Sequence, residues 1–202
     1  MSLTLLDWRR RVAALYAAAR SAADPESGWQ AWRDGRDELF ADHPDTPLSE
    51  AARETFSGLP FAAYDPALRF EAVPLPAEPF HLDVPTATDG VVPFDRIGAV
   101  ELDGFGRLDL WWLGSYGGGL FVPLRDGSAG STTYGGGRYL LDTVKGADLG
   151  SPGDRLVVDL NFAYHPSCTY DPRWSCPLAP DGNRLEATVA AGEQLPPDGG
   201  WY

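Results

Sequence analysis

The chain has 202 residues, 44% hydrophobic and 12% aromatic, which is enough apolar surface for a substantial core and excludes a disordered chain. Its formal net charge of −13 would repel a phosphate backbone, which argues against nucleic acid and anionic membrane as partners. No apolar run approaches a membrane span and the first residues lack a secretory pattern, so the expected compartment is the cytoplasm.

The first part of the sequence has the pattern of helices. Apolar residues recur at spacings of three and four over residues 5–19, which predicts an amphipathic helix. Asp24-Pro25 combines an N-cap residue with a proline at the first helical position, and a second helix is expected to run to about Ala41. One face of that helix carries Trp29, Trp32, Arg36, Leu39 and Phe40. Thr46-Pro47 is expected to begin a third, short helix that ends near Gly58.

Beyond residue 60 the apolar period changes from nearly four to two, which is typical of β-strands. Strands are predicted over residues 68–73, 80–84, 91–94, 97–102, 105–113, 120–124, 138–144, 156–160 and 185–190. Asp103-Gly104 between two apolar runs predicts a two-residue type I′ hairpin with positive φ at both positions. Short connections without helical patterns indicate antiparallel pairing. We therefore expect an α+β, mainly β fold: a helical segment (residues 1–58) packed on an antiparallel β-barrel or sandwich (residues 59–202), together forming one cooperative unit.

A loop of about twenty residues separates the last two predicted strands and contains both cysteines, Cys168 and Cys176. Loops of this length within a compact domain are usually functional or disordered. This loop is rich in proline and aromatic residues, which favours an ordered site or a rigid plug.

Several stretches resemble the bacterial family catalogued as domain of unknown function 1684. They are Tyr116-Gly-Gly-Gly-Leu-Phe-Val-Pro-Leu-Arg125-Asp126, Thr133-Tyr134-Gly-Gly-Gly-Arg138-Tyr139-Leu, Asp159-Leu-Asn161-Phe-Ala-Tyr164-His165-Pro-Ser-Cys168, Cys176-Pro-Leu, Asn183-Arg184-Leu and Ala191-Gly192-Glu193. The family pattern usually has Phe at position 160 and Asn at position 165, where this chain has Leu160 and His165. The resemblance therefore implies which positions belong to the family pattern, but the family has no agreed activity. Because position 165 departs from the pattern, the resemblance implies no family-wide role for His165.

Three interpretations of the cysteines remain open. Cys168 and Cys176 are structural, either as packed thiols or as a disulfide; or they bind a metal together with His165 and a fourth ligand from His81, Asp171 or water. In the third, Cys168 is a nucleophile, His165 its base, and Asp159 or Asp171 the residue that orients the base. The proline spacing of the loop favours the structural interpretation.

Two classes of function follow. In the first, a small-molecule-binding or enzymatic barrel has its pocket near the Asp159–Cys176 loop, and the catalytic candidates are His165, Cys168 and Asp159. Its ligand-binding candidates are Tyr116, Arg125, Arg138, Asn161 and Tyr164. In the second, a non-catalytic structural or interaction domain uses the same residues to lock the loop. No residue pattern selects a cofactor, flavin included.

Overall fold

The computed structural model describes residues 3–86, 90–114, 116–197 and 200–201. Within these ranges the helices are α1 (Leu3–Ser21), α2 (Pro25–Asp42) and α3 (Glu50–Glu54). The strands are β1 (Arg69–Ala72), β2 (Phe80–Thr86), β3 (Gly90–Leu102), β4 (Gly106–Leu113), β5 (Gly119–Leu124), β6 (Arg138–Asp142) and β7 (Leu156–Asp159).

The helices begin where side chains can cap them. The Asp24 carboxylate accepts a hydrogen bond from the Ser27 N–H at 2.9 Å and Pro25 follows it, which confirms the predicted start of α2. The third helix begins later than expected, with Ser49 as its N-cap. Thr46 does not open this helix because its hydroxyl donates to the Phe40 carbonyl, near the end of α2, at 2.8 Å.

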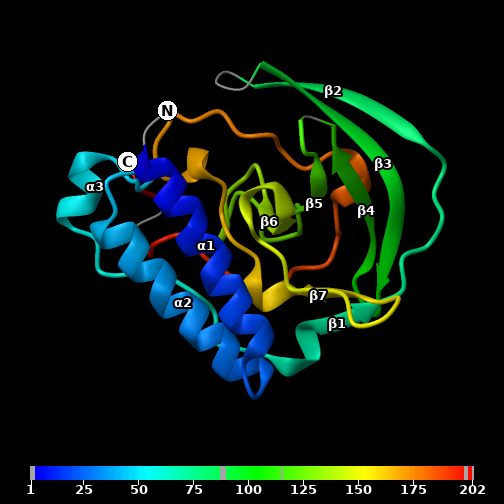
Figure 1. Cartoon of the computed structure of the whole chain (residues 1–202), viewed down its shortest axis with the longest axis horizontal. Coiled ribbons are helices and arrows are strands. Elements are labelled where there is room, and N and C mark those ends of the chain that lie inside the picture. The colour runs from blue at the N-terminus through cyan, green and yellow to red at the C-terminus, as the bar shows by residue number, and fades with distance from the viewer. Residues whose placement is uncertain (1–2, 87–89, 115, 198–199, 202) are drawn as a thin grey trace.

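The strands form two antiparallel sheets. The larger has the order β2-β3-β4-β5-β6 and curves around one side of the molecule, whereas β1 pairs with β7 in a two-stranded ribbon (Figure 1). Two expected strands, residues 91–94 and 97–102, are one long strand with an irregularity between Arg96 and Gly98. The sheets do not join into a closed barrel in the described part of the chain. The α+β class with mainly β structure is therefore confirmed, while neither the barrel nor the sandwich is.

The last predicted strand, residues 185–190, is wrong. Only alternate residues of the segment, Leu185 and Val189, are buried. The Leu185 N–H and the Ala187 carbonyl bond to the backbone of residues 125–127, but the Val189 N–H donates to the Asp126 carboxylate at 2.6 Å and its carbonyl accepts from Arg138 at 3.3 Å. Because a carboxylate and a guanidinium replace the neighbouring backbone at Val189, the alternating pattern of the sequence does not produce a continuous ladder.

The turn between β3 and β4 also differs from its prediction. The Phe105 N–H donates to the Leu102 carbonyl at 2.9 Å, so Asp103 and Gly104 are the central residues of a four-residue turn. Gly104 has a φ of 77°, whereas no described non-glycine residue has a positive φ. This is the sign pattern of a type II turn, in which proline is favoured at the first central position.

Gly104→Val is therefore expected to lower the free energy of unfolding by about 1 to 2 kcal/mol, because a β-branched residue is strained at positive φ. Asp103→Pro should leave stability nearly unchanged. Urea unfolding of both variants checks this, and an equally large loss in the two would contradict the observed turn.

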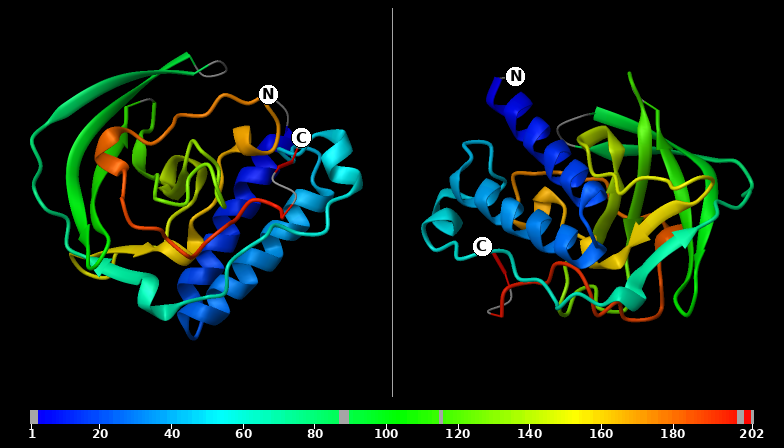
Figure 2. Two further views of the ribbon diagram at one scale, coloured as in Figure 1. Left: turned by 180° about the vertical axis from the view of Figure 1, so that it is seen from behind. Right: turned by 60° about the horizontal axis from the view of Figure 1, so that its bottom comes forward.

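The helical and β parts share one core region. Tyr16 of α1 and Trp32 of α2 pack with Phe162, whose ring lies 4.7 Å from that of Trp32. The paired helices cover one side of the strand-rich part in all three views (Figures 1 and 2). One cooperative unit would need such shared packing, and the single unit stays a prediction.

Candidate functional site

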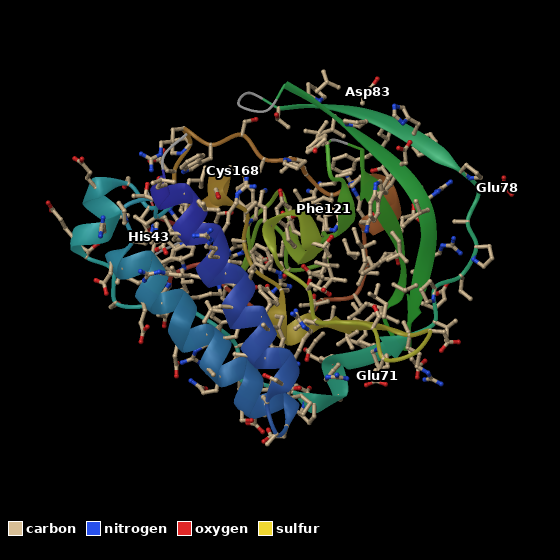
Figure 3. The ribbon with its side chains drawn as sticks, in the orientation of Figure 1. His43, Glu71, Glu78, Asp83, Phe121 and Cys168 are labelled. Atoms are coloured by element: carbon tan, nitrogen blue, oxygen red, sulfur yellow. The ribbon has the colours of Figure 1, made fainter. Side chains whose placement is uncertain are left out.

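A cavity of about 300 Å³ lies between α1, α2, the end of β6 and the segment of residues 164–177. We call it the helix–loop cavity. The turn that carries Cys168 lies beside α1 (Figures 2 and 3), so the cysteine loop forms one wall and the helices another. Its aromatic lining residues include Trp8, Tyr16, Phe40, Tyr139, Tyr164 and Tyr170. A concave site with aromatic walls and a few polar groups is typical of small-molecule binding.

Ionisable side chains also line the helix–loop cavity, namely Arg9, Arg36, Asp45, Asp142, Lys145 and His165. Lys145 pairs with Asp142 at 3.3 Å. By contrast, a larger hollow of about 860 Å³ beside α3 is lined by short or apolar residues such as Ala51, Thr55 and Trp201, with no ionisable residue among the described ones. The helix–loop cavity is therefore the better candidate for recognition of a polar ligand.

A buried charge network forms the floor of this site. Glu193 is completely buried, and its carboxylate accepts from Arg36 at 3.1 Å, from the backbone N–H of His165 at 3.1 Å and from the Tyr170 hydroxyl. Arg36 comes from α2, whereas the other three residues come from the last forty residues of the chain. The network therefore joins the helical segment to the cysteine loop.

Electrostatics keep Glu193 ionised and Tyr170 neutral. Burial alone would raise the pKa of Glu193, but hydrogen bonding with His165, the Arg36 charge and the Tyr170 hydroxyl together lower it. Burial, followed by the neighbouring Glu193 charge, raises the pKa of Tyr170 well above its ordinary value. These opposite pKa shifts favour a Tyr170 hydroxyl that donates to an ionised Glu193 carboxylate.

The orientation of His165 follows from its two ring nitrogens. Its Nε2 accepts a hydrogen bond from the Tyr134 backbone N–H at 3.2 Å, so that nitrogen carries no proton. The proton of the ring is therefore on Nδ1, which lies 3.5 Å from the Glu193 carboxylate. The Tyr134 N–H thus holds one side of His165, while Nδ1 is buried, faces the Glu193 carboxylate and makes no hydrogen bond with the described residues.

Arg36 is surrounded by aromatic rings. Its guanidinium carbon lies 5.1 Å from the ring centres of Trp32 and Phe40 and 5.0 Å from that of Tyr164, all within cation–π range. Among the residues that the structure describes, no acceptor forms a hydrogen bond with Arg36 Nε, although this atom is buried. Arg36 therefore lines the cavity and has a buried N–H whose acceptor is not among these residues.

A second buried ion pair holds the chain near this site. Arg138 of β6 pairs with Asp126 at 3.2 Å and donates to the backbone carbonyls of Val189, Ala191 and Glu193. All of these partners belong to the protein. Arg138 consequently fixes the segment that positions Glu193.

The sequence-predicted site residues fall into separate places. Tyr164, His165 and Cys176 line the helix–loop cavity. Arg138, Asp159 and Asn161 are buried away from it, Tyr116 is fully exposed, and Arg125 joins the segment after β5 to Leu185 through its backbone.

Asn161 and Asp159 are engaged by protein groups. The Asn161 side chain accepts from the Asp65 N–H at 2.9 Å and donates to the Asp65 carbonyl at 2.8 Å. Asp159 in turn accepts from the Asn161 backbone N–H at 2.9 Å. β7 ends at Asp159 and a 3₁₀ turn (Leu160–Phe162) follows, so the two residues do not share a strand face as expected.

The cysteines meet in space. The Cys168 backbone N–H donates to Cys176 Sγ at 3.4 Å, and both residues are free thiols. No three His, Cys, Asp or Glu side chains come together as a metal site in the described ranges. His165 is directed towards Glu193 and Tyr134.

Sequence reasoning missed Arg36 and Glu193 as members of the site. A signal for Arg36 was present, because an arginine on the apolar face of a helix must find a buried partner. Glu193 stood in the motif Ala191-Gly192-Glu193 without a suggested role. In the part of the chain that the structure describes, no helix is long and apolar enough to cross a bilayer.

Comparison with known proteins agrees with the motifs. None of the curated proteins matches the chain. A solved structure that does match is the solution NMR structure of an uncharacterised protein of Haloarcula marismortui, with a TM-score of 0.59 and 36% identity over 84% of this chain and 94% of that one. The model of the family described as "Protein of unknown function (DUF1684)" matches residues 54–194. The chain therefore belongs to the DUF1684 family.

Proposed function

We propose that the helix–loop cavity binds a small molecule with an apolar, planar body and an oxygen acceptor that meets Arg36. The observation that carries this proposal is the buried Arg36 guanidinium, which lines the cavity and has an N–H without an acceptor among the described residues. A binding role also accounts for ionisable groups between aromatic walls. Burying such groups costs stability, and proteins keep them where function requires them.

The size of the cavity limits the ligand. An apolar cavity of about 150 Å³ accommodates a benzene molecule. The helix–loop cavity has about 300 Å³, so it has room for a body of about two fused rings. Such rings would stack or pack edge-on against the aromatic walls. A carboxylate or carbonyl oxygen supplies the acceptor that Arg36 needs.

The second class of function, in which polar residues only hold the loop in place, describes residues outside the helix–loop cavity. Arg138, Asp159 and Asn161 have their polar atoms engaged by protein groups, which supports a structural role for them. Catalytic roles for His165, Cys168 and Asp159 stay predictions. We also retain the expectations of a cytoplasmic location and of no nucleic acid or membrane partner, on the grounds of the chain's negative charge and sequence pattern.

Naphthoate is a suitable probe because it combines two fused rings with a carboxylate. Titration calorimetry is expected to show binding, and Ser175→Trp should weaken it by at least about tenfold, or 1.4 kcal/mol, because the indole would fill the cavity that Ser175 lines. Ser151→Trp is the matched control, since Ser151 is exposed and does not line the cavity. Naphthalene, which has no acceptor, should bind more weakly than naphthoate.

Equal affinity of wild type and Ser175→Trp for naphthoate would place binding elsewhere and contradict the proposal. Equal affinity for naphthalene and naphthoate would remove Arg36 from recognition.

A further inference from the structure

The two thiols are arranged as a pair, although neither is needed for the binding proposed above. Cys168 lies in a 3₁₀ turn (Ser167–Thr169), and Cys176 lies on the segment that returns past it. The Cys168 N–H donates to Cys176 Sγ at 3.4 Å, and each thiol shifts the pKa of the other. Cys176 Sγ therefore lies against the residue whose own sulfur would be its partner in a disulfide.

We propose that Cys168 and Cys176 form a redox-active thiol pair, in which hydrogen peroxide oxidises Cys168 and Cys176 then closes an intramolecular disulfide. This is a modification site with its own chemistry, and it stands whether or not the helix–loop cavity binds a ligand.

The surroundings favour a thiolate at Cys168. A hydrogen bond from the Cys176 thiol, assisted by the Tyr134 hydroxyl and by backbone N–H groups, lowers the pKa of Cys168 to about 6. The same hydrogen bond raises the pKa of Cys176, so one sulfur of the pair is the anion and the other the donor. The other ionisable groups that act on the pair are Tyr139 and Lys145. Because the thiolate is the reactive form, Cys168 is the sulfur that attacks.

Access selects a small oxidant. Cys168 is 9% exposed, whereas Cys176 is half-buried and lines the helix–loop cavity. A bulky disulfide such as oxidised glutathione would have to reach a buried sulfur past the loop. Hydrogen peroxide is little larger than water and does not meet that obstacle.

The reaction balances in two steps. The Cys168 thiolate attacks one oxygen of hydrogen peroxide and the O–O bond breaks. Hydroxide is the leaving group, and Cys168 becomes a sulfenic acid. The Cys176 sulfur then attacks the sulfenic sulfur, the S–O bond breaks, and the oxygen leaves as water with the Cys176 proton and the sulfenic proton. Two electrons pass from the two thiols to the peroxide, and a small dithiol returns them by exchange.

Intact-mass spectrometry of the full chain under non-reducing conditions tests this. One equivalent of hydrogen peroxide should remove two hydrogens from the monomer, and dithiothreitol should restore them. In Cys176→Ser, which lacks the second sulfur, the mass should instead rise by one oxygen, the sulfenic acid on Cys168. In Cys168→Ser, Cys176 should stay unmodified at the same dose.

Alkylation separates this pair from packed, inert thiols. With limiting iodoacetamide on the native wild type, peptide mapping should find Cys168 labelled before Cys176, with a midpoint well below the free-thiol pKa of about 8.5. This measurement needs no variant, so it holds even where a serine substitution impairs folding. Failure to lose two hydrogens, a disulfide between two chains, or labelling of Cys176 first would each overturn the proposal.

Discussion

Glu193→Gln is expected to lower the free energy of unfolding by about 3 to 5 kcal/mol, which is the usual cost of removing one partner from a buried ion pair. Glutamine has the shape of glutamate, but one carboxylate oxygen becomes an NH2 donor, so the loss combines the charge with one acceptor. Arg36 keeps its positive charge in a buried position without the carboxylate 3.1 Å away. Urea unfolding at neutral pH measures this. Glu186→Gln is the matched control because Glu186 is exposed.

The difference in the free energy of unfolding between wild type and Glu193→Gln should also depend on pH. The pKa of Glu193 is lowered in the folded state, so its contribution is complete above the ordinary glutamate pKa of about 4.3 and is lost as the pH falls through the folded-state pKa. The difference in stability between wild type and Glu193→Gln should be constant near neutral pH and narrow in acid. A difference below about 1 kcal/mol at neutral pH would show that the network does not hold the fold.

Arg138→Met is the second variant for which we expect a loss of about 3 to 5 kcal/mol. Methionine fills much of the same space but leaves the Asp126 carboxylate buried without its cation, and it leaves three backbone carbonyls without their donor. Since those carbonyls belong to the segment that carries Glu193, the variant should also loosen the floor of the helix–loop cavity.

Arg155→Met provides the control for this second prediction because Arg155 is exposed. Thermal and urea unfolding of the two variants give the comparison. A stable Arg138→Met protein that has lost naphthoate binding would assign Arg138 to ligand recognition and would contradict the structural role that we give it.

The helices and most strands could be predicted because their signals are local. Asp24 and Pro25 mark the start of α2 within two residues, and the apolar period changes at the boundary between the helical and β parts. Residues 185–190 show where local signals fail. Their alternation is that of a strand, yet the side chains of Asp126 and Arg138, 63 and 51 positions away, take the place of a backbone partner at Val189. Such partners depend on tertiary structure.

The part of the candidate site that lies in one loop could also be predicted from local sequence, whereas the part that depends on tertiary contacts could not. Tyr164, His165 and Cys176 lie in one loop, so their proximity follows from sequence. Arg36 lies 157 positions before Glu193, and only the packing of α2 against the end of the chain brings them together. The polar side chains of Arg138 and Asn161 suggested a pocket, and the structure shows them bonded to backbone groups that no local pattern indicates.

A crystal structure of the protein with bound naphthoate tests the central claim most directly. We expect the two rings between the α1 and α2 side chains and the cysteine loop, near Trp8, Tyr164 and Tyr170, with the carboxylate within hydrogen-bond distance of Arg36. Naphthoate bound at another place, or an empty helix–loop cavity in crystals saturated with the probe, would contradict the account.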